Sequence, residues 1–180
     1  MYEMEDIKFC FLDYNSESEL LEYEKKLYDA FYEKYTSNVQ VYGKIWCLID
    51  DRMKPTIEYT DQIVYIAKSD SQIVWSLSAN TNTAIKMQFE DMGFSITEEE
   101  RNQGIGEVLA LFTRTHINPY KFVSAFVEDF CYSDLRSRGV KMVYTTCSNH
   151  VLKTYLRIGF TLKDQKVING EEKFLLEKQL

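Results

Sequence analysis

The stretch FSITEEERNQGIG, residues 94–106, decides the fold that this sequence predicts. Its second half, Arg101–Gly106, is a short polar loop in which two glycines flank an isoleucine. We expect a strand before this loop, Ala84–Ile96, and a helix after it, Glu107–His116. In that setting the amides of Gln103–Gly106 and the start of the helix can bind an anion such as a phosphate. A plain strand-to-helix turn is the alternative.

The sequence on either side of this loop predicts an α+β protein. Strands are expected at Ile7–Leu12, Gln62–Ala67, Gln72–Ala79 and Val140–Cys147, followed by a closing hairpin of Phe160–Ile168 and Glu172–Leu176 about Asn169-Gly170. Helices are expected at Ser18–Tyr35, Tyr120–Ser137 (with Gly139 as its C-cap) and Ser148–Ile158. Thr36–Asp61 is ambiguous, because Val39–Ile49 within it fits either a strand or a buried helix. These elements predict a mixed, mostly antiparallel central sheet of about six or seven strands flanked by helices.

Composition excludes several classes of protein. The chain has 180 residues and a formal net charge of -7, which argues against non-specific binding of nucleic acid. No apolar run is long enough for a signal peptide or a membrane span, so we expect a cytoplasmic protein without membrane contact. The chain has two histidines and four scattered cysteines, a set that does not predict a metal site. Cys147 is expected to be a buried, inert thiol.

Three segments together resemble the GNAT superfamily of acyl-CoA-dependent N-acyltransferases. The first is residues 94–106, which is similar to the family's acyl-CoA loop, R/Q-x-x-G-x-G/A after an aliphatic strand. The second and third are Gly139–Cys147 and Tyr155–Phe160, which look like the fifth strand and the following helix that ends in Y-x-x-x-G-F. The resemblance implies one GNAT-like domain, 1–180, with an acceptor-side part, 1–61, and an acyl-CoA-binding core, 62–180.

The resemblance also implies where the co-substrate, acetyl-CoA or another acyl-CoA, would bind. The residues that it assigns to acyl-CoA are Phe94, Ser95, Ile96, Arg101, Asn102, Gln103, Gly104, Ile105, Gly106, Ser148 and Asn149. The backbone of the first three would pair with the pantetheine arm, and Gln103–Gly106 would hold the pyrophosphate. Ser148 stands where the family often has asparagine, with Asn149 one residue later. Amides at a bulge on the fourth strand would polarise the thioester oxygen.

Two catalytic roles follow from the same resemblance. Glu90, placed on the fourth strand, would act as the base that removes a proton from the attacking amine. Asp91 is the reserve, and a charged residue on an exposed strand face is the alternative reading of Glu90. Tyr155 would act as the general acid that protonates the departing thiolate, the alternative being a tyrosine that only packs its helix.

The sequence leaves the acceptor open. The expected activity is transfer of an acetyl or other acyl group to a primary amine, on a small molecule or a peptide. A longer-chain acyltransferase, similar to the autoinducer or N-acyl amino acid synthases, is a second hypothesis. A non-catalytic acyl-CoA-binding module is a third. His116–Val123 is an expected insertion that would reshape the acceptor pocket, form a homodimer contact or only pack.

Overall fold

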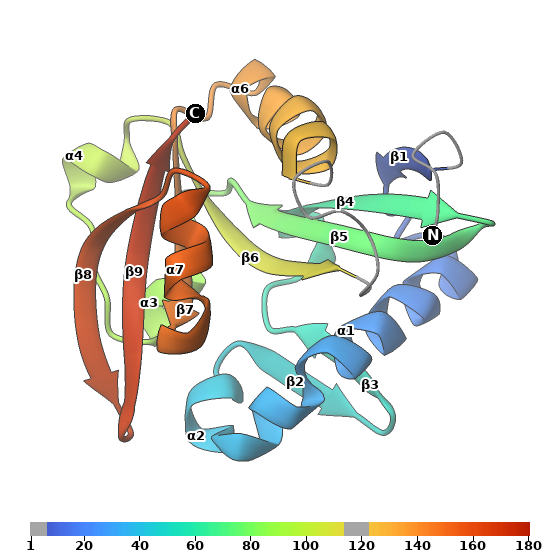
Figure 1. Cartoon of the computed structure of the whole chain (residues 1–180), viewed down its shortest axis with the longest axis horizontal. Coiled ribbons are helices and arrows are strands. Elements are labelled where there is room, and N and C mark those ends of the chain that lie inside the picture. Colours follow the sequence, from blue (N-terminus) through green and yellow to red (C-terminus); the bar gives the residue numbers. More distant parts are fainter. Residues whose placement is uncertain (1–6, 114–122) are drawn as a thin grey trace.

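A seven-stranded sheet forms the centre of the protein in a computed structural model that describes residues 7–113 and 123–180 (Figure 1). Its strands are β1 (Ile7–Phe11), β4 (Gln62–Ser69), β5 (Gln72–Asn80), β6 (Ile105–Thr113), β7 (Met142–Ser148), β8 (Thr161–Ile168) and β9 (Glu171–Gln179). They lie in the order β1-β4-β5-β6-β7-β9-β8, in which β6 and β7 are parallel and all other neighbours are antiparallel. Strands β2 (Trp46–Ile49) and β3 (Arg52–Pro55) form a separate hairpin.

Helices occupy most of the connections. They are α1 (Glu17–Ser37), α2 (Val39–Tyr42), the 3-10 helix η2 (Tyr59–Asp61), α3 (Gln88–Asp91), α4 (Glu98–Arg101), the π-helix η3 (Val123–Tyr132), α6 (Ser133–Ser137) and α7 (Asn149–Arg157). The two one-turn helices α3 and α4 lie between β5 and β6. Within residues 7–113 and 123–180, every helix is too short or too polar to cross a membrane.

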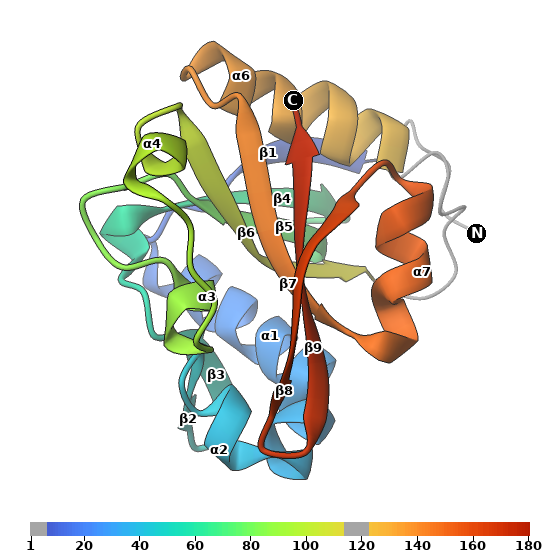
Figure 2. The same cartoon turned by 90° about the vertical axis from the view of Figure 1, so that its left-hand side faces the viewer.

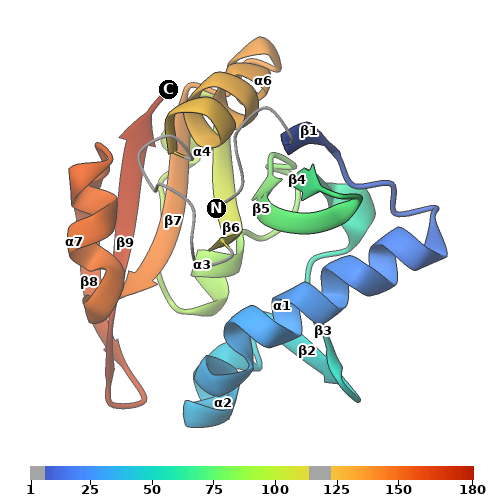
Figure 3. The same ribbon diagram turned by 45° about the vertical axis from the view of Figure 1, so that its right-hand side comes forward.

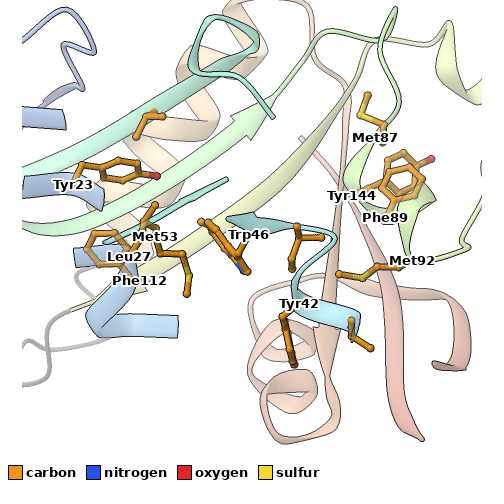
Figure 4. Packing of buried hydrophobic residues seen from close by; sticks show 14 of the residues in the cluster. Tyr23, Leu27, Tyr42, Trp46, Met53, Met87, Phe89, Met92, Phe112 and Tyr144 are labelled. Carbon is orange, nitrogen blue, oxygen red and sulfur yellow. The ribbon is translucent and has the colours of Figure 1, made fainter. Parts of the chain in front are cut away.

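Each face of the sheet is covered by a hydrophobic core. Tyr23 and Leu27 of α1 belong to one core, with α2, the β2–β3 hairpin and α3; we call this side the α1 face (Figures 3 and 4). Phe126 of η3 belongs to the other core, to which α6 and α7 also contribute; we call this side the α7 face. Because both faces are buried, the central strands are apolar along most of their length.

Most of the predicted elements are confirmed. Both strands of the 62–80 meander, the first helix, the fifth-strand segment and the closing hairpin form where expected. Asn169 (φ 49°) and Gly170 (φ 80°) have the positive φ values that this two-residue turn requires. Gly139, at φ 86°, ends α6 as predicted. Of the helix predicted at 120–137, the part from residue 123 is described; most of the expected insertion, His116–Val123, lies outside the described residues.

Two predicted elements next to the glycine loop are wrong. The expected helix Glu107–His116 is strand β6 over its described part, up to Thr113. Ala110 and Phe112 face the α1 core and Val108 faces the α7 core. A strand buried on both faces loses the apolar–polar alternation that distinguishes strand from helix in a sequence.

The expected strand Ala84–Ile96 is instead an irregular segment that contains α3. The amide of Met87 donates to the Glu90 side chain (2.8 Å) and closes a single helical turn. The amides of Gln88 and Phe89 donate to the buried carboxylate of Glu107 at 2.6 and 2.8 Å. These side-chain acceptors take the place of the strand pairing that the apolar pattern suggested.

Candidate active site

The parallel strands β6 and β7 separate along their length (Figure 1). They pair only at Ile105↔Met142, Gly106↔Val143 and Glu107↔Tyr144, although β6 continues to Thr113 and β7 to Ser148. The facing edges of their carboxyl-terminal halves are therefore not paired with each other. An extended chain that carries amide groups could hydrogen-bond to such edges as an added strand does.

A cavity of about 150 Å³ lies in the gap between these two strands. Its wall includes Val108, Leu109 and Leu111 of β6 and Thr145–Ser148 of β7. The remaining lining residues come from both faces of the sheet: Phe31, Lys34, Tyr42, Ile45, Trp46, Gln88 and Met92 on the α1 face, Val151 and Tyr155 of α7, and Lys173 of β9. The cavity thus connects the two faces of the sheet through the gap.

A β-bulge interrupts β6 beside this cavity. Ser78 of β5 pairs with Ala110, and the next residue, Ala79, pairs with Val108, so Leu109 has no opposing residue on β5. A bulge redirects the local backbone toward one side of the strand. The sequence predicted a bulge on a strand at 84–96; the structure has a bulge on β6 instead.

Tyr155 lies on α7 and lines the cavity. Its ring packs edge-to-face on Phe160, with the ring centroids 5.3 Å apart. Burial, and to a smaller extent Cys147, raise the pKa of Tyr155 to about 12, while the Thr145 hydroxyl acts in the opposite direction. The phenol therefore holds its proton at neutral pH and can donate it.

The start of α7 brings Ser148 and Asn149 next to the cavity. Ser148 lines it, and its hydroxyl lies 3.1 Å from Nδ1 of His150. Both predicted residues also line a second, open cavity, together with His150, Lys153 and the β8–β9 turn. Cys147 lies beside them; burial raises the pKa of its thiol to about 11, as is typical of an unreactive cysteine.

The glycine loop lies at the opposite end of β6 from the wide end of the gap, beside α4 (Figure 2). Gly104 has φ 77°, and a Cβ there would lie 2.4 Å from the carbonyl oxygen of Gly139. The Gly104 carbonyl accepts hydrogen bonds from the amides of Lys141 (2.6 Å) and Met142 (3.3 Å). These contacts join the starts of β6 and β7. The loop precedes a strand rather than a helix, so the structure lacks the helix start on which the predicted phosphate site depended.

The other residues of the predicted acyl-CoA loop lie away from the wall of this cavity. None of Phe94, Ser95, Ile96, Arg101, Asn102, Gln103, Ile105 and Gly106 lines the cavity between β6 and β7. Phe94 is buried, and the Lys166 ammonium lies over its ring at 5.4 Å. Arg101 donates to the carbonyls of Thr83 and Ile85 (3.3 Å each). The edge of residues 94–96 is not a strand, because the chain is irregular there.

Glu90 and Asp91 lie on α3 and not on a strand, so their predicted placement is wrong. One Glu90 oxygen accepts the Met87 amide and the other pairs with Arg101 at 2.5 Å. Asp91 pairs with Lys86 at 2.5 Å on the surface. Neither carboxylate lines the cavity.

The sequence analysis missed a buried carboxylate and two lysines. Burial raises the pKa of Glu107 to about 8, although the amides of Gln88 and Phe89 lower it. Lys34 and Lys173 line the cavity from α1 and β9. The signal for Glu107 was a charged residue inside an otherwise apolar strand, which predicts a buried and partnered group. Lys173, at the charged start of the β9 sequence, and Lys34, in an amphipathic helix, gave no such signal.

Comparison with known proteins identifies the fold. No protein-family model matches the sequence, and neither does any curated protein. Among solved structures, the CoA-dependent acyl-homoserine lactone synthase BjaI is similar with a TM-score of 0.69 at 14% identity, over 96% of this chain and 82% of BjaI. The acyl-homoserine lactone synthase LasI is similar with a TM-score of 0.67 at 13% identity, over 96% and 88% of the two chains.

A protein from Desulfovibrio desulfuricans assigned to the GNAT family of acetyltransferases is also similar, with a TM-score of 0.60 at 12% identity, over 96% of this chain and 98% of that one. At such identities the similarity concerns the fold. The seven-stranded mixed sheet with its flanking helices is therefore the GNAT fold, which this chain shares with acetyltransferases and acyl-homoserine lactone synthases.

Proposed function

We propose that this protein transfers an acyl group from acyl-CoA to the nitrogen of an amine. The observation that carries the proposal is the cavity between the separated strands β6 and β7, with the β6 bulge on one side and Tyr155 on the other. The facing strand edges fit the amide-bearing pantetheine arm. BjaI, which has this fold, is a CoA-dependent synthase and was solved with isopentyl-CoA.

In the proposed reaction the amine nitrogen attacks the thioester carbonyl carbon. A C–N bond forms, the C–S bond breaks, and the amine loses one proton, so that acyl-CoA and amine become an amide and free CoA. Tyr155 donates its proton to the departing thiolate, and the proton released by the amine nitrogen passes through water to replace it, so that no net proton is gained or lost. Backbone groups at the Leu109 bulge lie beside the cavity, where they can polarise the thioester oxygen. Glu90 has no part in this scheme, because both its oxygens are bound outside the cavity.

The two faces of the sheet divide the substrates. Acyl-CoA is assigned to the α7 face, where Ser148 and Asn149 start α7 and where Tyr155 lies. The acceptor is assigned to the α1 face, where residues 1–61 contribute Phe31, Tyr42 and Trp46 to the cavity wall. We keep the prediction that the insertion, His116–Val123, contributes to the acceptor side.

A longer acyl chain is the second candidate, because much of the cavity wall is apolar. Phe31, Ile45, Trp46, Met92, Leu109 and Leu111 provide this apolar wall. Acetyl and longer chains can be separated by comparing acyl-CoAs of increasing length, since each buried methylene contributes about 0.8 kcal/mol.

The test combines binding and turnover. Thermal shifts with CoA, acetyl-CoA and octanoyl-CoA measure binding, and release of free thiol measures transfer to a panel of amines. Thiol release that depends on an amine supports the proposal. A thermal shift without thiol release for any amine would favour a non-catalytic binding module. No shift with any of the three ligands would contradict acyl-CoA binding altogether.

A further inference from the structure

A buried lysine forms one end of the cavity on the α1 face. Lys173 of β9 is 3% exposed, and its Nζ lies 2.9 Å from a carboxylate oxygen of Glu171 and 2.6 Å from the hydroxyl oxygen of Tyr42. The Tyr42 hydroxyl donates to the same Glu171 oxygen at 2.8 Å. The Lys173 ammonium also lies 4.1 Å from the centroid of the Tyr42 ring. Glu171 therefore balances the charge of Lys173, and Tyr42 fixes the position of both groups.

A second lysine lines the same end of the cavity. Lys34, in the last turn of α1, is half-buried, and within residues 7–113 and 123–180 it makes no ion pair. Burial lowers its pKa and the positive charge of Lys173 lowers it further, while the charge of Glu171 acts in the opposite direction. Burial alone would raise the pKa of Glu171, but hydrogen bonds from Lys173 and Tyr42 bring it below its usual value. Two ammonium groups and one carboxylate leave this end of the cavity with an excess positive charge.

Apolar side chains surround this charge. Phe31 and Trp46 are stacked with their ring centroids 5.1 Å apart, and Met92 lies on the same wall. A partly desolvated cation without a partner is unfavourable, and an anionic group placed beside it offsets the loss of hydration. The protein as a whole carries a net charge of -7, so this local excess of positive charge opposes the overall balance.

We infer that the acceptor amine also carries a carboxylate, which binds beside Lys34 and Lys173, so that the substrate class is an amino acid or a simple derivative with a free carboxylate. The inference rests on the proposed acyl transfer, because it assigns the acceptor side of that same cavity. The carboxylate binds at the cationic end on the α1 face, and the amino group is left to reach the thioester carbon in the gap. Lys34 and Lys173 bind substrate and take no part in the proton transfers.

The test measures binding apart from turnover. The protein with CoA is titrated calorimetrically with the common L-amino acids, and each amino acid that binds is compared with its decarboxylated amine, such as phenylalanine with phenethylamine. A charge-assisted contact contributes about 1.5–3 kcal/mol, so the carboxylate should tighten binding about tenfold or more. Equal binding of both members of the pair, or no binding of any amino acid, overturns the inference even where thiol release proves acyl transfer.

Variants of α1 locate the contact. Lys34→Met should bind an amino acid and its decarboxylated amine equally well and leave the thermal shift with CoA unchanged. Lys34→Arg should keep the preference for the amino acid. Lys25→Met is the matched control, because Lys25 lies on the same helix in an exposed ion pair with Asp51. Retention of the full preference in Lys34→Met overturns the assignment. A fall in kcat in Lys34→Arg that is equal for both members of a pair would instead identify Lys34 as a base.

The carboxylate that binds beside Lys34 and Lys173 could instead belong to the acyl group. Succinyl-CoA has a terminal carboxylate where butanoyl-CoA has a methyl group, so both are compared with the wild-type protein and with Lys34→Met. A Lys34-dependent preference for succinyl-CoA, with no preference among the amines, would place the anion on the acyl chain and contradict the inference. A preference among the amines alone supports it.

Discussion

The hydroxyl of Thr145 donates a 3.0 Å hydrogen bond to the carbonyl oxygen of Val108, one residue beyond the last main-chain pairing of β6 with β7. A side chain thus continues the connection between the two strands at the point where their backbones separate. The cavity begins beyond this contact, with both residues in its wall.

Thr145→Val should therefore weaken the junction of the two strands. The Val108 carbonyl loses its partner in a buried position, so we expect a loss of about 1 kcal/mol in the free energy of unfolding and a higher KM for acyl-CoA. Urea unfolding and steady-state kinetics measure the two effects. Thr161→Val is the control, because Thr161 makes a similar bond at 3.3 Å on the surface. An equal loss in both variants would contradict the role given to Thr145.

Tyr155→Phe should reduce turnover without reducing affinity for CoA. The ring and its packing on Phe160 are kept, but the proton for the thiolate is removed, so we expect kcat to fall about 10²-fold or more. Thiol release measures kcat, and the thermal shift with CoA measures binding. Tyr132→Phe, which alters a buried tyrosine outside the cavity, is the control. Unchanged turnover would exclude Tyr155 as the acid.

Gly104→Ala should destabilise the protein by more than Gly170→Ala does. Both glycines have positive φ, which costs a non-glycine residue on the order of 1–3 kcal/mol. At Gly104 the new Cβ would also lie 2.4 Å from the Gly139 carbonyl oxygen, whereas at Gly170 no atom lies within 4 Å. Thermal unfolding of the two variants measures the difference. A stable Gly104→Ala that has lost only CoA binding would return the loop to its predicted role in phosphate binding.

Glu107 should make stability depend on pH. Its folded-state pKa of about 8 lies above the ordinary value of 4.5. The contribution of Glu107 to the free energy of unfolding is therefore fully present below pH 4.5 and is lost as pH rises through 8. Glu107→Gln should remove this part of the pH dependence and also weaken α3, because its NH₂ group cannot accept a backbone amide. Urea unfolding between pH 5 and pH 9 measures both effects, with Glu99→Gln on the surface as control. An unchanged pH profile in Glu107→Gln would contradict the raised pKa.

The sequence predicted best where local chemistry sets the structure. The 62–80 meander follows from β-branched and aromatic residues separated by a turn, in which Asp70 and Ser71 have positive φ. The position of Tyr155 on α7 could be predicted, because one helix end fixes its distance from Gly159-Phe160. The sequence also predicted a bulged strand, but placed it at 84–96, whereas the bulge lies on the next strand, β6.

The errors arose where contacts distant in the sequence decide the structure. Strand β6 is apolar because it is buried on both faces, and in the sequence this pattern resembles a buried helix. Helix α3 depends on Glu107, a carboxylate from the next strand. The cationic end of the cavity combines Lys34, Tyr42 and Lys173 from three separate elements, and no single motif contains them.

The short parallel contact between β6 and β7 also has a consequence for how the protein folds. Strands β4, β5 and β6 are joined as an antiparallel meander, and β8 and β9 as a hairpin, whereas the pairing of Ile105–Glu107 with Met142–Tyr144 requires closure of a long stretch of chain for only three residue pairs. Because contacts distant in the sequence form slowly, and only three residue pairs reward this closure, we expect this junction to form late. A ligand that binds across both strands would then slow unfolding by stabilising a late step of assembly.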